Sequence, residues 1–184
     1  MRVGAVVLAA GASKRLGEPK QLVRLGTETL LERTVRVASE AGCSPVVVVL
    51  GASSTSIQAN CDLGGATLVV NEDWVDGMGS SVGVGVRTLR DVEACVVMTC
   101  DMPAVTSEHL RSLMDSGAVT ASCYAGRRGV PAYFPASIFS SLMELHGDAG
   151  ARDLLRLAPC VELVGGELDV NTAKDLALVR ALFG

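Results

Sequence analysis

Aromatic residues make up only 3% of this 184-residue chain, and its 16 Lys and Arg residues are outnumbered by 20 Asp and Glu residues, for a net charge of −4. Without a basic surplus the chain lacks the broad cationic surface that nucleic-acid binding by counterion release requires. With so few aromatics it also lacks the stacking platforms of single-strand binders. We therefore expect no nucleic-acid partner.

Long hydrophobic runs and Cys-x-x-Cys pairs are also missing. The longest apolar run, from Val3 to Ala12, ends before Lys14 and Arg15, well short of the roughly 18 to 20 residues that a membrane span needs. The same two cations follow too closely for a typical secretion signal. Most of the six cysteines lie in apolar runs, where a free thiol packs as a small hydrophobe. These features predict a cytoplasmic protein with reduced cysteines and no membrane partner.

Hydrophobic residues, by contrast, are plentiful at 49% of the chain. A disordered chain would lack the apolar area that offsets the entropy of ordering. A chain of this length has room for one ordinary domain, which buries about 70% of the surface that its unfolded form exposes. No linker rich in Pro, Gly or Ser divides it. We therefore expect a single domain over residues 1–184.

Short runs rich in Val or Ala recur along the chain and do not alternate with polar residues. Such runs are typical of parallel strands that are covered on both faces. Between them, apolar residues recur at helical spacing. The alternation predicts an α/β fold with a three-layer, doubly wound and mostly parallel sheet. The expected strands are 4–9, 45–51, 67–70, 94–99 and 118–124, and the expected helices are 29–41, 80–89, 107–114, 136–145, 149–157 and 172–182.

The amino end carries a local excess of positive charge. Residues 1–25 contain five basic side chains against one acidic side chain. Three of these cations, Lys14, Arg15 and Lys20, lie in a loop of small residues directly after the first predicted strand. Small residues let backbone N–H groups approach an anion, and ligands of α/β sheets bind beyond the carboxyl ends of the strands. The loop is thus predicted to bind phosphate; the alternative is a solvated loop whose cations only aid solubility.

This loop matches neither of two common phosphate-binding motifs. The span from Gly11 to Gly17 is one residue too long for a Walker loop, and Glu18 and Pro19 stand where Lys and Ser or Thr would follow. No G-x-G-x-x-G follows the first strand, as a Rossmann dinucleotide site would require. We therefore expect the loop to bind phosphate through another type of motif.

The loop resembles the signature of the nucleotidyltransferases related to the molybdenum cofactor guanylyl- and cytidylyltransferases, and its closest pattern is that of the molybdopterin cytidylyltransferases. The resemblance implies a Rossmann-like nucleotidyltransferase fold, and further blocks continue it in order along nearly the whole chain. The matching blocks are Leu8-Ala-Ala-Gly-x-Ser-x-Arg15-x-Gly17-x-Pro-Lys20-Gln-Leu, Asn71-x-x-Trp74-x-x-Gly77-Met-Gly-Ser-Ser81-Val, Cys100-Asp101-Met-Pro103, Gly129-x-Pro131-Ala-x-Phe134, Gly147-Asp148-x-Gly-Ala-Arg152 and Asp169-x-Asn171-Thr-x-x-Asp175-Leu.

Asp101 follows an apolar strand and should project toward the same edge of the sheet as the first loop. Mg²⁺ needs one or two protein oxygens besides phosphate and water, so one carboxylate with a distant partner suffices. By resemblance that partner is Asn171, with Asp169 as a spare. Asp101 could instead cap the helix expected at 107–114, and Asn171 the last helix. We expect Mg²⁺ at Asp101, with Arg15 and Lys20 as the catalytic cations that neutralise charge in the transition state.

The resemblance places the nucleotide on residues 1–103. Ala at position 10 goes with cytidylyl transfer in the family and Gly with guanylyl transfer, so CTP is favoured. Ser80 and Ser81 could meet the edge of cytosine, or could cap the helix that begins there. The expected nucleotide-binding set is Leu8, Ala9, Ala10, Gly11, Arg15, Lys20, Ser80 and Ser81.

Residues 104–184 then form the acceptor-binding half, because the later loops must face the second substrate across the crevice. Pro131 lies in one of these loops. Asp148 is expected to cap a helix whose free N–H groups hold a phosphate, and Arg152 could reach the same anion; its alternative is a solvated helix residue. His109 and His146 have no evident task and are expected on the surface or on helices.

Together these residues predict transfer of CMP from CTP to a phosphorylated pterin, with release of pyrophosphate, by a monomer that could also meet a molybdoenzyme apoprotein. A sugar or polyol phosphate is the alternative acceptor. Two other classes stay open: a non-catalytic protein that delivers the cofactor, and a serine hydrolase. The hydrolase would use Ser81 of Gly79-Ser-Ser-Val-Gly83 with His146, but an elbow needs a strand directly before it, and residues 71–78 are polar and turn-like.

Overall fold

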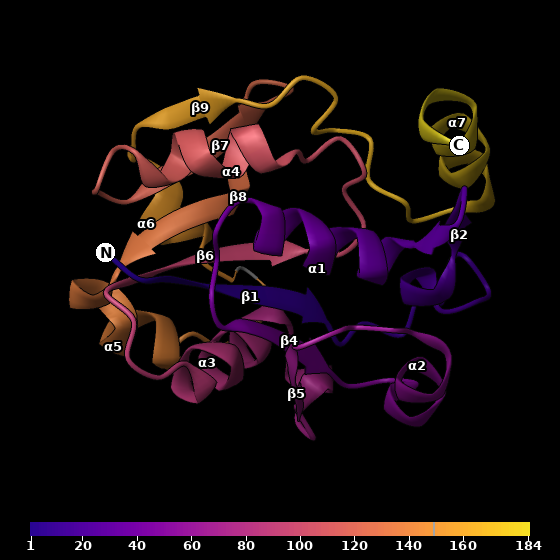
Figure 1. The fold of residues 1–184 in the computed structure, drawn as a ribbon, viewed down its shortest axis with the longest axis horizontal. Coiled ribbons are helices and arrows are strands. Elements are labelled where there is room, and N and C mark those ends of the chain that lie inside the picture. The colour runs from indigo at the N-terminus through magenta and orange to yellow at the C-terminus, as the bar shows by residue number, and fades with distance from the viewer. Residues whose placement is uncertain (149) are drawn as a thin grey trace.

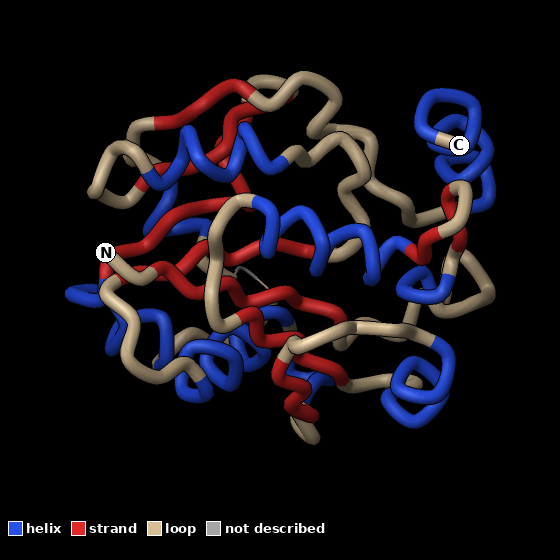
Figure 2. The backbone as a smooth tube through the Cα atoms, viewed as in Figure 1, coloured by secondary structure: helices blue, strands red, loops and turns tan. Residues whose placement is uncertain are grey.

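A seven-stranded sheet forms the centre of the molecule and is packed by helices on both faces (Figures 1 and 2). The computed structural model describes residues 1–148 and 150–184. The strand order is β5-β4-β1-β6-β8-β7-β9. Strands β5, β4, β1 and β6 are parallel, β8 is antiparallel to β6 and β7, and β9 is parallel to β7. The predicted three-layer, mostly parallel α/β fold is confirmed.

The bounds of the elements are as follows. The strands are β1 (Val3–Ala9), β2 (Arg24–Leu25), β3 (Glu28–Thr29), β4 (Val46–Leu50), β5 (Thr67–Val70), β6 (Ala94–Thr99), β7 (Thr120–Tyr124), β8 (Arg127–Pro135) and β9 (Cys160–Glu162). The α-helices are α1 (Leu30–Glu40), α2 (Ser54–Asn60), α3 (Met78–Thr88), α4 (Ser107–Met114), α5 (Phe139–Met143), α6 (Arg152–Leu155) and α7 (Ala173–Phe183). The 3-10 turns are η1 (Lys20–Leu22), η2 (Trp74–Asp76) and η3 (Ala136–Ile138).

The central strands are apolar throughout because both faces of the sheet are covered. Successive side chains of a strand point to opposite faces. In β1, Ala5 and Val7 pack in the layer formed with α1 and α4, whereas Val6 and Leu8 pack in the layer formed with α3 and α5. All seven residues of β1 are buried, as are all five of β4. This burial explains why the runs do not alternate in polarity.

Helix α7 brings the end of the chain back to its beginning. Its capping box joins Thr172 and Asp175, which fixes where the helix starts. Val179 of α7 shares a third apolar cluster with Val23, just after η1. Residues 169–171, directly before the helix, therefore lie near the loop that follows β1, as the right-hand side of Figure 1 shows.

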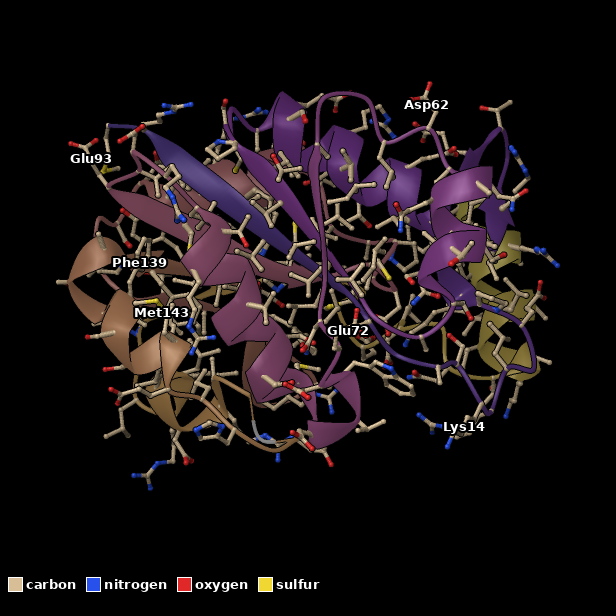
Figure 3. The ribbon with its side chains drawn as sticks, turned by 90° about the horizontal axis from the view of Figure 1, so that it is seen from below. Lys14, Asp62, Glu72, Glu93, Phe139 and Met143 are labelled. Carbon is tan, nitrogen blue, oxygen red and sulfur yellow. The ribbon has the colours of Figure 1, made fainter. Side chains whose placement is uncertain are left out.

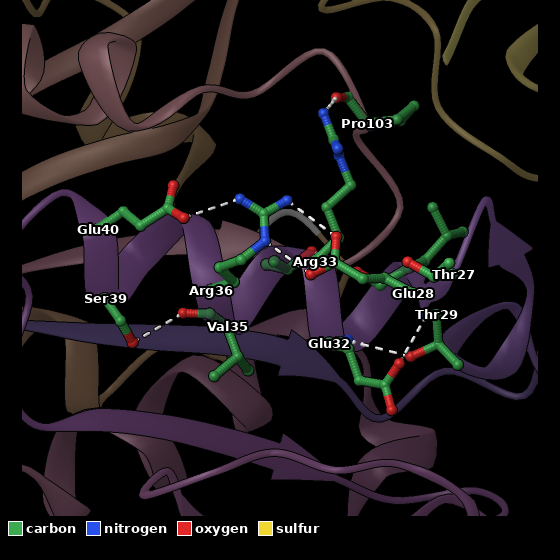
Figure 4. A network of polar contacts seen from close by, with 12 residues as sticks. Thr27, Glu28, Thr29, Glu32, Arg33, Val35, Arg36, Ser39, Glu40 and Pro103 are labelled. Carbon is green, nitrogen blue, oxygen red and sulfur yellow. Dashed lines mark hydrogen bonds and ion pairs between the residues drawn. The ribbon is translucent and has the colours of Figure 1, made fainter. Parts of the chain in front are cut away.

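Helix α1 supports the loop that follows β6. It begins with a capping box between Thr29 and Glu32. On the same helix, Arg33 donates from Nη2 to the carbonyl oxygen of Pro103 at 3.0 Å (Figure 4). This contact ties the segment just beyond Asp101 to the α1 layer.

Several elements differ from the expectation, since β2, β3, β8, β9 and α2 were not predicted. The sequence analysis missed β8, which pairs with β7 as a hairpin; Ala125 and Gly126 of its turn have φ of 48° and 71°, as a primed hairpin turn requires. The sheet is therefore not parallel throughout. Strand β5 was expected to be buried, but it is an edge strand, and its Leu68 and Val70 are 39% and 37% exposed.

The expected helix 149–157 and its cap are also corrected. Helix α6 is one short turn, and its N-cap is Ala151, with no side-chain cap. Asp148 therefore does not cap it. Gly147 and Gly150 have φ of 70° and 54°, so the chain turns there instead of starting a helix. Residue 149, the first of the expected helix, lies outside the described residues.

The carboxyl ends of β1 and β6 point to one side of the molecule, where α7 lies (Figure 1). Figure 3 shows the same polarity in side chains: Lys14, which follows β1, and Glu93, which precedes β6, lie at opposite ends. The carboxyl edge is therefore where the functional groups are sought. Within the part of the chain that the structure describes, no helix is long and apolar enough to span a bilayer.

Candidate functional site

The loop after β1 presents a row of backbone donors. No described residue accepts a hydrogen bond from the N–H groups of residues 11–15. Ser13 has a left-handed backbone with φ of 53°, and its carbonyl accepts from the N–H groups of Leu16 and Gly17 at 3.0 and 3.2 Å. Lys14 and Arg15 are exposed beside these donors. Free N–H groups in a turn, with cations around them, form an anion-binding concavity.

Lys20 and Asp101 form the polar centre of the site. The Nζ atom of Lys20 lies 2.6 Å from Oδ2 of Asp101 and 3.3 Å from Oδ1 of Asn171. The two side chains of the ion pair are only 19% and 11% exposed. Burial disfavours the charge of Lys20, but attraction and hydrogen bonding to Asp101 outweigh it and raise the pKa of Lys20 above its ordinary 10.5. Lys20 is thus held as a cation.

The chain places these groups from three separate segments. Asp101 stands two residues beyond Thr99, the last residue of β6, and its own carbonyl accepts from the N–H of Val170 at 3.0 Å. That bond seats residues 169–171 against the end of β6. Asp169 in turn accepts a hydrogen bond from the amide of Asn171. The structure therefore brings together the three residues that the sequence predicted as metal ligands.

The donor set here fits a divalent cation. The carboxylate of Asp101 and the amide oxygen of Asn171 converge on one positive charge, the ammonium of Lys20, which shows that the spot attracts a cation. Hard oxygen donors of this kind suit Mg²⁺ or Mn²⁺, which keep several waters and phosphate oxygens besides. Among the described residues no group of three His, Cys, Asp or Glu side chains could hold a metal without such help.

Ser80 and Ser81 lie inside α3 instead of capping it, since the N-cap is Gly77. The amide nitrogen of Asn71 donates to both hydroxyls, at 2.9 and 3.0 Å. Asn71 is 3% exposed, and sequence reasoning missed its role although it begins one of the motif blocks. Ser81 is not a nucleophile on an elbow, because the 3-10 turn η2, and not a strand, comes before α3.

A cavity of about 110 Å³ lies between the loop and α3. Its lining includes Leu8, Ala9 and Ala10 of the β1 end, with Lys20, Ser81 and Asp101. Next to the loop, a second cavity of about 160 Å³ is lined by Gly11, Lys14, Arg15, Lys20 and Asn171, among others. Every residue of the predicted nucleotide-binding set except Ser80 lines one of these two cavities.

A third cavity, of about 290 Å³, opens on the other side of Asp101. Its lining includes Asp101, Asp148 and Arg152, two of which were predicted to bind the acceptor. Arg127 and Arg128 also line it, and sequence reasoning missed both because it missed the strand that carries them. The three arginines are exposed and can contact an anionic group, while three aspartates, Asp101, Asp148 and Asp169, line the same cavity.

Pro131 does not line that cavity. It is buried in β8, and its carbonyl accepts from the hydroxyl of Ser122 at 2.6 Å. Because the Ser122 hydroxyl donates its proton to the Pro131 carbonyl, the Nε2 atom of His109, 2.7 Å away, must donate to Ser122. His109 is therefore a buried residue behind the cavity wall, and burial lowers its pKa below 6.5. His146 is exposed, as expected.

The largest cavity, of about 650 Å³, lies elsewhere. It sits beside Pro45, at the amino end of β4; two of its charged lining residues, Arg36 and Glu28, form a surface ion pair at 2.6 Å. The side chain of Glu32, which also lines it, accepts from the backbone N–H groups of Thr29 and Asp62, so this open groove at the amino edge offers no convergent chemistry. The three smaller cavities meet around Lys20 and Asp101 instead.

The chain is similar to known proteins over nearly its whole length. The chain is 34% identical to nicotine blue oxidoreductase of Paenarthrobacter nicotinovorans over 98% of its own length and 95% of the relative's. It is 26% identical to molybdenum cofactor cytidylyltransferase of Escherichia coli over 64% and 62%. The structure matches Rv0371c of Mycobacterium tuberculosis, solved in complex with manganese, with a TM-score of 0.80, 31% identity and coverage of 98% and 99%.

These relatives support the expected resemblance at the level of the family but not at the level of a cytidylyltransferase, since they include an oxidoreductase as well as a cytidylyltransferase. A family model for the MobA-like NTP transferase domain matches residues 5–164, which include the loop after β1, Lys20 and Asp101. The chain therefore belongs to the family of MobA-like NTP transferase domains.

Proposed function

We propose that this protein transfers CMP from CTP to a phosphorylated pterin, the molybdenum cofactor type of acceptor, and releases pyrophosphate. The observation that carries the proposal is the convergence of Lys20, Asp101 and Asn171 beside a loop with five free N–H groups. Such a site suits a triphosphate and the cation that accompanies it. The identity to a molybdenum cofactor cytidylyltransferase supports the choice of acceptor.

The chain's own residues account for most of the chemistry. The N–H groups of residues 11–15 would hold the leaving phosphates, with Arg15 and Lys20 as neutralising cations. A substrate phosphate is already ionised, so no side chain is needed as a general base. The remaining task is to align that phosphate with the α-phosphorus, which is a matter of positioning.

Asp101 and Asn171, with Asp169 as a support, would hold Mg²⁺. The ion would supply charge neutralisation at the transferred phosphate. Lys20 contacts Oδ2 of Asp101 and Oδ1 of Asn171, so it would share these oxygens with the ion or turn toward the phosphates. The manganese complex of the Rv0371c protein supports a divalent cation in this fold.

The small cavity beside Ala10 favours a pyrimidine. Ser81 accepts a hydrogen bond from Asn71 and no described residue accepts its hydroxyl proton, so that proton is free to meet an acceptor on the base. Cytosine offers its ring nitrogen and carbonyl oxygen as acceptors. The wall of three arginines on the far side of Asp101 would bind the acceptor's anionic group.

Pyrophosphate release is the direct test. Purified protein with Mg²⁺ is mixed with CTP or GTP and, in turn, with molybdopterin, a sugar phosphate or a polyol phosphate. We expect release only with molybdopterin and at least tenfold faster with CTP, and Ala10→Gly should narrow that preference. Faster use of GTP would refute the base assignment, and release only with a sugar phosphate would refute the acceptor. A protein that binds CTP but releases nothing with any acceptor would be a delivery protein.

A second candidate is an oxidoreductase, which the 34% identity to nicotine blue oxidoreductase favours. The same anion-binding loop would then hold the pyrophosphate of a dinucleotide. Oxidation of a reduced nicotinamide dinucleotide by a quinoid dye, followed by absorbance, tests it. Activity in that assay together with no pyrophosphate release would replace the transferase proposal.

A further inference from the structure

Gln21 lies beneath the phosphate-binding loop, in the same 3-10 turn as Lys20. Its side chain is 1% exposed. Both hydrogens of its amide are used: Nε2 donates to the carbonyl oxygen of Ala9 at 2.8 Å and to that of Gly11 at 3.1 Å. One side chain therefore ties down two carbonyls of the loop.

The bond to Gly11, together with a backbone bond to the neighbouring Ala10 carbonyl, fixes which way two N–H groups of the loop face. In a planar trans peptide the C=O and the following N–H point in opposite directions. The Gly11 carbonyl is drawn inward to Gln21, so the N–H of Ala12 is turned outward. Likewise the Ala10 carbonyl accepts from the N–H of Ala52 at 3.0 Å, which turns the N–H of Gly11 away from the protein. The inner carbonyls are thus satisfied and the outer donors are left free.

The oxygen of the Gln21 amide, unlike its nitrogen, does not stabilise the fold through hydrogen bonds. Oε1 of Gln21 is buried and has no hydrogen-bond partner among the residues that the structure describes. An unpaired buried acceptor disfavours the folded state. Gln21 also lines the small cavity between the loop and α3, together with Lys20, Ser81 and Asp101. A residue that leaves one group unsatisfied while it orients a ligand-binding loop is better explained by binding than by packing.

We propose that Gln21 is a positioning residue for the polyphosphate of the bound nucleotide, acting through the N–H group of Ala12, whose peptide carbonyl it holds. The inference rests on the proposed function in one respect: it takes the loop's ligand to be a triphosphate. It concerns binding of that group and not the base, the acceptor or the transfer step. Because Lys20 lies in the same 3-10 turn, η1, Gln21 also fixes the position of the loop relative to the Lys20 cation.

The test compares Gln21→Met, which keeps the length of the side chain and removes both donors, with Gln58→Met on exposed helix α2 as the matched control. Calorimetry without acceptor gives the Kd of CTP and the Kd of inorganic tripolyphosphate. We expect Gln21→Met to raise both by tenfold or more and by similar factors, and the control to stay within twofold. At saturating CTP, kcat should remain within threefold, so the change appears in KM.

A purely structural role would instead lower the unfolding midpoint and leave the Kd values of the folded protein unchanged. That result, or a loss of CTP affinity without a loss of tripolyphosphate affinity, overturns the proposal. Should Gln21→Met fail to fold, Gln21→Asn keeps the amide but is too short to reach both carbonyls, and the same two Kd values decide. If wild-type protein binds both ligands but never releases pyrophosphate, the proposed transferase activity is refuted. The role of Gln21 is then still decided by how much Gln21→Met raises the two Kd values.

Discussion

Replacing Asp101 by alanine should abolish transfer and leave the fold intact. Asp101 is 7% exposed, but it lies in the turn that follows β6 and not in an apolar cluster. Its carboxylate contacts Lys20 and is the main charged ligand proposed for the metal. Removing a single preorganised electrostatic contact to a transition state typically costs about 100-fold to 1000-fold in kcat. We expect at least that loss here.

The cost in stability follows from the burial of the ion pair. Removing one partner of a fully buried pair costs about 3 to 5 kcal/mol, whereas exposed pairs contribute about 0.2 to 1 kcal/mol. The pair of Lys20 and Asp101 lies between these limits, and Lys20 keeps Asn171 at 3.3 Å and the attraction of Asp169. We therefore expect a loss of about 1 to 2 kcal/mol, or roughly 2 to 8 °C in Tm for a chain of this size.

The pH dependence of that loss has a definite sign. The pKa of Lys20 is raised in the folded protein above its ordinary 10.5, so the pair's contribution is fully present below that value. It is lost as the pH rises through the folded pKa. The difference in stability between wild type and Asp101→Ala should therefore shrink above pH 10.5, and urea titrations at pH 8, 10 and 11 would measure it.

Asp101→Asn provides the matched control. The amide keeps the size of the side chain and an oxygen for Lys20, so most of the stability should return. The negative charge does not return, so the rate should stay low. Far-ultraviolet circular dichroism checks the fold of both variants. A rate for Asp101→Ala within tenfold of wild type in Mg²⁺ would refute the assignment of Asp101 as a metal ligand.

Two further predictions concern the acceptor side. Arg152→Ala should raise the KM of the acceptor while the calorimetric Kd of CTP stays within twofold, because Arg152 lines the cavity beyond Asp101 and not the two beside the loop; an equal loss of CTP affinity would place it in the nucleotide site. His109 is buried and its pKa is lowered, so the unfolded chain binds the proton more readily and stability falls as the pH drops below 6.5. His109→Leu should flatten that slope in denaturant titrations between pH 5 and 8, and an unchanged slope would contradict the assignment.

The sequence predicted the parallel part of the sheet well because burial on both faces leaves a visible pattern. Val46–Leu50 consists of four valines and a leucine, all buried. Strand β8 leaves no such pattern: it begins with Arg127 and Arg128 and contains Pro131, and prolines within a run argue against a strand. Its hairpin turn, Ala125-Gly126, was the missed signal. Missing the strand meant missing the arginines that it carries.

The site was predictable to the extent that charge marks it. Lys20 and Asp101 are 81 positions apart in the sequence, yet each follows a strand with a shared carboxyl edge, and this topology brings them to 2.6 Å. Gln21 and Asn71 were not found, because a neutral amide gains its role from the carbonyls and hydroxyls that folding places around it. Asp148 was given the wrong role since a cap depends on backbone angles, and Gly147 and Gly150 take left-handed ones.

The three small cavities explain how two substrates would meet at one phosphorus atom. Asp101 and Met78 line both the cavity beside Ala10 and the cavity of the arginines, while Lys20 joins the first of these to the phosphate-binding loop. Helix α3 carries Met78 and is seated against the later loop through Gly79, whose N–H donates to the carbonyl of Gly147 at 2.9 Å. A Cβ on Gly79 would come within 2.8 Å of the backbone of His146, so only glycine permits this approach. Met78, Thr99 and Asp101 therefore line both cavities, and under the proposed function an attack from the arginine side would approach the α-phosphorus from the side away from the loop proposed to hold the leaving pyrophosphate.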